Sequence, residues 1–125
     1  MTPFGRKLRE LRQQKSVTLK QMAAEIGVSS AYLSALEHGK RGTPAWYLVQ
    51  RIISYFNVIW DEAEELERLA QISNPRVTID TGGMSPEATE YSNRLAQQIG
   101  KLEPNELKEM LKFLDIRVRQ SRKTG

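Results

Sequence analysis

The chain of 125 residues contains no cysteine and a single histidine, His38. Without cysteine it can form neither a disulfide nor a thiolate metal site, and this absence favours a reducing compartment. One histidine leaves no second imidazole for a histidine-based metal site. The acidic residues between positions 61 and 67 share one predicted helix, and no second acidic cluster stands at metal-ligand spacing. We therefore expect no metal, no cofactor and no enzymatic activity.

Long apolar runs are also missing. No stretch approaches the roughly 20 consecutive apolar residues that a membrane-spanning helix needs, and the start of the chain, MTPFGRKLRELR, is too charged for a signal peptide. Gly82 and Gly83 are not followed by the Lys and Ser or Thr of a phosphate-binding loop. We expect a cytoplasmic, nucleoid-associated protein with no membrane partner.

The net charge of +4 is modest, but the charges are unevenly distributed. Residues 1–51 contain nine Lys or Arg and three acidic residues, whereas residues 52–74 contain one Arg and five acidic residues. A basic region beside an acidic helix is typical of a protein that binds phosphate groups with one side. The alternative is that each charge run is only a solvated helix face.

Apolar residues at intervals of three and four predict an all-α protein. Thr18 is a good N-cap for one helix, and Ser29 or Ser30 for the next, which Gly39 then ends. A first domain over residues 1–73 is expected to contain five helices, over 4–14, 19–25 and 30–37 and then beginning at Pro44 and at Asp61.

The second part of the chain predicts a linker and a helical hairpin. Residues 74–84 contain proline and glycine, and residues 76–80 alternate polar and apolar side chains, which indicates a linker with a short strand or an extended segment. Residues 85–120 are expected to form the hairpin and the basic residues 121–125 a disordered tail. Its helices carry apolar stripes, formed by Ala88, Tyr91, Leu95 and Ile99 and by Leu107, Met110, Leu111, Leu114 and Val118.

These stripes are more apolar than one short hairpin can bury by itself. Pairing with a second copy would bury both stripes in a four-helix arrangement, so we expect a homodimer formed through the C-terminal helices. The alternative is that the hairpin covers the N-terminal domain of its own protomer.

The segment between residues 19 and 38 has the pattern of two short helices joined by a tight turn. Ala23 is small enough for the second helix to approach closely, and Gly27 takes the left-handed conformation at little cost. With these residues in place, the sequence TLKQMAAEIGVSSAYLSALEHGK resembles the helix-turn-helix of the phage-repressor (Xre/Cro-like) family of bacterial regulators. Arg12 and Glu37 match positions that often form a structural ion pair in that family.

The resemblance implies a role for individual residues. Ser30, Ala31 and Ser34 match positions that face base edges in the major groove of double-stranded DNA. They depart from the Gln and Asn of better-known members, so the target sequence is not readable from them. Contacts with the DNA backbone are implied for Thr18, Lys20, Tyr32, Lys40 and Arg41.

We therefore expect a sequence-specific transcriptional regulator, most simply a repressor that acts as a homodimer on a palindromic operator. Two alternatives keep the same fold. One is an antitoxin that represses its own operon and neutralises a toxin. The other is an adaptor that binds a protein partner, such as a co-regulator, in place of DNA.

Overall fold

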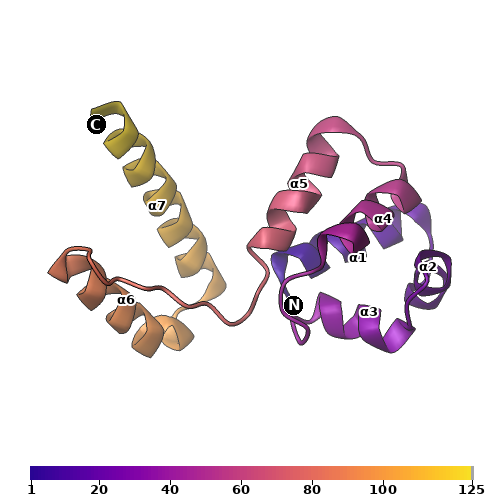
Figure 1. The fold of residues 1–125 in the computed structure, drawn as a ribbon, viewed down its shortest axis with the longest axis horizontal. Helices are drawn as coiled ribbons and strands as arrows, with labels where there is room; N and C mark the ends of the chain where they lie inside the picture. Colours follow the sequence, from indigo (N-terminus) through magenta and orange to yellow (C-terminus); the bar gives the residue numbers. More distant parts are fainter. Residues whose placement is uncertain (125) are drawn as a thin grey trace. The chain divides into compact units, whose positions relative to one another are not determined.

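The computed structural model describes the backbone of residues 1–124 and the side chains of residues 1–122. The chain divides into two compact units, the first spanning Met1–Thr78 and the second beginning at Ile79. Every regular element within residues 1–124 is a helix (Figure 1), so the all-α prediction is confirmed.

The first unit contains the five expected helices. Two of them begin elsewhere than predicted: the α4 helix starts at Trp46 because Ala45 is still extended, with ψ of 143°, and Pro44 therefore precedes the helix. The α5 helix starts one residue before Asp61. The bounds are α1 (Pro3–Lys15), α2 (Leu19–Ile26), α3 (Ser30–Glu37), α4 (Trp46–Phe56) and α5 (Trp60–Gln71).

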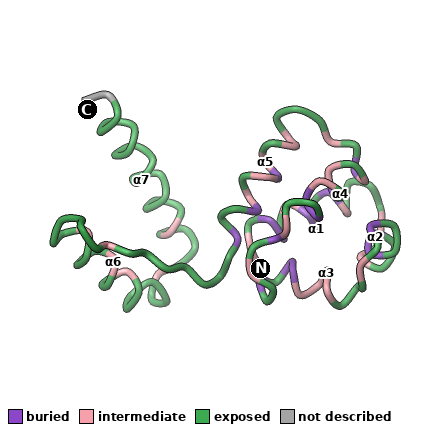
Figure 2. The backbone as a smooth tube through the Cα atoms, viewed as in Figure 1, coloured by how far each residue is buried: buried purple, intermediate pink, exposed green. Residues whose placement is uncertain are grey.

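All five helices contribute to one apolar core (Figure 2). Their buried residues recur at intervals of three and four, so each helix turns one stripe inward. Complete burial of a Leu, Ile or Phe side chain contributes roughly 1.5–3 kcal/mol relative to exposure. This core forms the rigid platform on which α3 is mounted. Its largest members are Phe4, Leu8, Leu11, Met22, Leu33, Leu36, Leu48, Ile52 and Leu66.

The chain that leaves α5 is fastened to the beginning of α1. The Ser73 hydroxyl accepts a hydrogen bond from the Phe4 N–H (2.9 Å) and donates one to the Leu69 carbonyl (2.6 Å). Ser73 is buried, so both bonds are sheltered from water. Beyond it, the Asn74 Oδ1 accepts a hydrogen bond from the Arg76 N–H at 3.0 Å. The first residues of the expected linker are therefore part of the first unit.

The second unit contains α6 (Pro86–Gln98), a single 3₁₀ turn η1 (Ile99–Lys101) and α7 (Pro104–Thr124). Ser85 caps α6, since its hydroxyl accepts from the Ala88 N–H. No strand forms at 76–80: an isolated extended segment has no neighbouring strand with which to pair its backbone groups. The expected disorder at 121–125 is wrong for 121–124, which continue α7 because Arg and Lys favour helix. Gly125 lies outside the described residues.

The helices of the second unit leave their apolar stripes open. Figure 2 shows no buried residue among the described side chains of 79–122. Leu111 and Phe113 of α7 are 61% and 66% exposed. The expected hairpin therefore has two helices but no core of its own. No helix within the described chain is long and apolar enough to cross a bilayer.

Candidate nucleic-acid interface

The beginning of α2 is fixed by a reciprocal cap. The Thr18 hydroxyl accepts from the Gln21 N–H (3.0 Å), and the Gln21 side-chain oxygen accepts from the Thr18 N–H (2.9 Å). These bonds leave the N–H groups of Leu19 and Lys20 as the first unsatisfied donors of the helix. Thr18 and Lys20 are both exposed, so this helix end is open to solvent.

A tight turn connects α2 with α3. Gly27 has φ of 90° and ψ of 32°, a left-handed conformation that a residue with a side chain adopts only at a cost. The Ala23 carbonyl accepts from the N–H groups of both Gly27 (2.9 Å) and Val28 (3.0 Å). Ala23 itself is 2% exposed, which leaves no room for a larger side chain between the helices.

The two sides of α3 differ sharply in burial. Ser29 caps the helix by accepting from the Tyr32 N–H at 3.0 Å. Leu33 and Leu36 are buried in the core, whereas the first turn of the helix lies at the surface. Of the predicted base-facing residues, Ser30 and Ala31 are exposed and Ser34 is half-buried.

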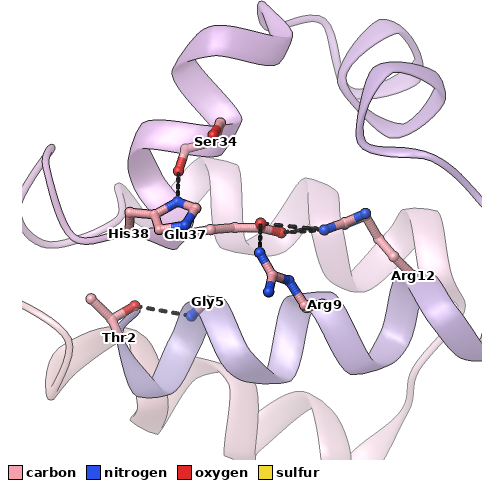
Figure 3. Close-up of polar contacts among 7 residues, drawn as sticks. All are labelled: Thr2, Gly5, Arg9, Arg12, Ser34, Glu37 and His38. Atoms are coloured by element: carbon pink, nitrogen blue, oxygen red, sulfur yellow. Dashed lines mark hydrogen bonds and ion pairs between the residues drawn. The ribbon is translucent and has the colours of Figure 1, made fainter.

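An ion pair holds the other end of α3 against α1. Glu37 is 1% exposed, and its carboxylate accepts from Arg12 Nε (3.2 Å) and Nη2 (3.1 Å), as Figure 3 shows. Arg9 approaches the same carboxylate at 3.9 Å. The predicted partners Arg12 and Glu37 therefore lie together, and their contact ties the recognition-helix end to the core.

Gly5 permits this close approach, and sequence reasoning missed it. A Cβ built on Gly5 would lie 2.1 Å from the Glu37 carbonyl oxygen, far inside van der Waals contact. The same oxygen accepts from the Thr2 N–H at 3.1 Å. The available signal was a glycine within a predicted helix, directly after the apolar Phe4 and at a position where no turn is needed.

Three of the predicted backbone-contacting cations have no acidic partner. Lys20, Lys40 and Arg41 are exposed, and within residues 1–122 no carboxylate forms an ion pair with them. The Arg41 guanidinium lies 5.5 Å from the centre of the Tyr32 ring, so the loop after α3 contacts the helix through a cation–π interaction. The positive charge at this end of the first unit is therefore available to an anion.

Two short helices joined by a left-handed glycine, the second with an exposed first turn, make a helix-turn-helix unit. The comparison with protein families agrees: the family model described as "Helix-turn-helix domain" matches residues 3–72, more than half of the chain. The chain belongs to this family.

Two curated relatives come from Bacillus subtilis (strain 168). The uncharacterized HTH-type transcriptional regulator RghRB is 41% identical over 61 residues, which are 49% of this chain and 44% of RghRB. The HTH-type transcriptional repressor RghR is 34% identical over 61 residues, 49% of this chain and 45% of RghR. The matched region thus spans less than half of each relative. The solved SinR–SinI protein complex contains a chain similar to this one at 19% identity, with a TM-score of 0.44, over 93% of this chain and 98% of its own.

Proposed function

We propose that this protein is a sequence-specific transcriptional regulator and that α3 reads the major groove of duplex DNA. The observation that carries the proposal is the exposed first turn of α3 beside cations that no carboxylate neutralises. An α-helix fits the major groove, and the phosphates on either side supply the opposite charge. The names of both Bacillus relatives, which describe transcriptional regulators, support the same function.

Ser30, Ala31 and Ser34 would face the base edges. A serine hydroxyl donates to or accepts from several bases, and the Ala31 methyl can pack against the methyl group of thymine. None of the three forms the bidentate bond of an amide or a guanidinium with a base. Each contact therefore discriminates weakly, and specificity would depend on reading two half-sites together.

Five residues would contact the phosphate backbone: Thr18, Lys20, Tyr32, Lys40 and Arg41. The hydroxyl of Thr18 accepts in the cap but keeps its own hydrogen for a phosphate oxygen. The free N–H groups at the beginning of α2 can bind the same anion. Tyr32 and Arg41 already touch one another, so they would present a hydroxyl and a guanidinium from one side of the groove.

Replacement of both Lys40 and Arg41 by Ala tests the DNA contact. Each lost phosphate contact releases fewer counterions, so the slope of log K against log salt should fall by about 0.9 per contact in each protomer. Binding to a duplex selected from a random pool and to an unrelated duplex should weaken alike. The variant Lys108→Ala/Lys112→Ala, in α7, removes the same charge and serves as the control. Equal salt slopes for both variants would contradict the assignment.

The finer proposal is a repressor that binds a palindromic operator as a homodimer. One relative is named as a transcriptional repressor, which supports the direction of regulation. The dimer is supported by the open apolar stripes of α6 and α7, because contiguous exposed apolar residues are rare on monomers. A two-fold dimer also matches a palindrome in symmetry.

A groove between α6 and the beginning of α7 suits the α7 helix of a second copy. Its walls are partly apolar, with Tyr91, Leu95, Leu102 and Met110 among the lining residues. It also carries carboxylates from α6, whereas the later turns of α7 are rich in arginine, so the two surfaces are complementary in charge.

Two acidic substitutions in the α7 stripe test the dimer. Leu111→Glu/Leu114→Glu should convert a dimer into a monomer by light scattering, because a buried unpaired carboxylate is strongly unfavourable. DNA affinity should fall more than about 100-fold as the second half-site is lost. Asn105→Glu/Lys112→Glu places the same groups off the stripe and should remain dimeric. A monomeric wild-type protein, or a dimeric stripe variant, would refute this interface.

A further inference from the structure

We infer that Arg76, Lys40 and Arg41 together form a binding hollow for the phosphate backbone of duplex DNA, at the junction of the α3–α4 loop and the chain that leaves α5. This inference rests on the proposed DNA-binding function and adds to it a residue from the expected linker. The hollow is lined by Gly39, Lys40, Arg41, Gly42, Asn74, Pro75 and Arg76.

The two segments of this hollow lie side by side although more than thirty positions separate them in sequence. Gly39 is buried, and a Cβ built on it would lie 3.6 Å from Pro75 Cγ. A Cβ on Gly42 would lie 4.0 Å from the side-chain amide of Asn74. Both glycines have positive φ, 79° and 75°, which lets the loop fold back toward residues 74–76.

Arg76 is held in place by local bonds and does not belong to a free linker. Two residues before it, the Asn74 side chain accepts from the Arg76 N–H. Three residues before it, the buried Ser73 hydroxyl is bonded to both α1 and α5. Because its backbone is already ordered, Arg76 would lose less conformational entropy on binding than an arginine in a flexible segment.

The charge of the hollow is entirely positive. Among its lining residues there is no Asp or Glu, and no ion pair within residues 1–122 involves Lys40, Arg41 or Arg76. Three cations around one hollow repel one another until an anion enters. A guanidinium binds phosphate through two parallel N–H donors, which suits Arg76 and Arg41 to this ligand.

Duplex DNA is the occupant that fits the position of the hollow. The loop begins directly after α3, whose opposite end carries the proposed base-facing residues. A recognition helix in the major groove brings the loop that follows it near a bordering phosphate strand. The hollow therefore continues the proposed interface along the DNA backbone.

The test compares Arg76→Gln with Arg76→Lys and with Arg68→Gln in the full-length protein. Arg68 is exposed in the last turn of α5 and forms no ion pair within the described residues, so its substitution is the matched control. Binding is measured between 50 and 200 mM salt on a duplex selected from a random pool and on an unrelated duplex of equal length. Thermal unfolding verifies that each variant is folded.

Arg76→Gln should lower the salt slope by about 0.9 per protomer, so that the advantage of the wild type shrinks about 3.5-fold over this range. The loss should be equal on both duplexes, since a phosphate carries no sequence information. Arg76→Lys should keep the slope, and Arg68→Gln should match the wild type. If the wild type binds both duplexes and Arg76→Gln keeps its slope, the hollow is refuted while the proposed function stands. If the wild type binds no duplex, both are refuted.

Discussion

Gly5→Ala is expected to lower the free energy of unfolding of the first unit by about 3 kcal/mol, at the upper end of the usual cost of overpacking. Alanine favours a helix interior by about 1 kcal/mol over glycine, so helix propensity alone predicts the opposite sign. The contact decides against it, because the new Cβ would lie 2.1 Å from the Glu37 carbonyl oxygen. Backbone atoms on both sides would have to move apart, and the bond from the Thr2 N–H to the same oxygen would be strained.

Thermal unfolding followed by circular dichroism measures this effect. A loss of this size should lower the Tm of a domain of this length by more than about 10 °C. Gly100→Ala is the matched control, because a Cβ at Gly100 would meet nothing within 4 Å. The control should leave the first unit unchanged. If Gly5→Ala were as stable as the wild type, the close packing of α1 against the end of α3 would be wrong.

Arg12→Met is expected to destabilise the same contact by a different route. The substitution leaves the Glu37 carboxylate 98% buried, with Arg9 at 3.9 Å as its only remaining cation in the described chain. Removal of one partner from a buried ion pair costs about 3–5 kcal/mol, since the other charge stays desolvated. Arg12 is 15% exposed, so we expect a value near the lower end, about 3 kcal/mol.

A double-mutant cycle separates the pair from general packing. Glu37→Met alone should cost less than Arg12→Met, because Arg12 can turn toward water. The double variant Arg12→Met/Glu37→Met should recover much of the loss, since neither charge then remains buried alone. Urea unfolding of the four proteins gives the coupling energy. Additive effects would show that the ion pair contributes no coupling between α1 and α3.

The two experiments concern one physical feature, the attachment of the recognition helix at its C-terminal end. Its other end carries the exposed turn that would enter the DNA groove. A helix fastened at one end and free at the other presents its first turn without losing its orientation. For this reason we expect both substitutions to weaken DNA binding as well as folding.

Local features of the chain could be predicted from sequence because neighbouring residues determine them. Thr18, Ser29 and Ser85 cap helices through bonds to residues only three positions away. Gly27 ends α2 through its own backbone conformation. The all-α class followed from the spacing of apolar residues, and the helix-turn-helix family followed from a pattern contained in one continuous segment. Even the ion pair between Arg12 and Glu37 was expected only because the family resemblance relates those two positions.

Tertiary structure alone decided the contacts between distant parts of the chain. Phe4 and Ser73 are bonded across 69 positions, and no local pattern marks either residue for the other. The sequence by itself determined where the helices begin, which stripes are apolar and which segment turns. Only the fold decided that Gly5 must lack a side chain and that Arg76 joins the loop after α3. The physical reason is that capping and periodicity depend on interactions within one or two turns, whereas steric contact and charge clustering depend on which surfaces meet in space.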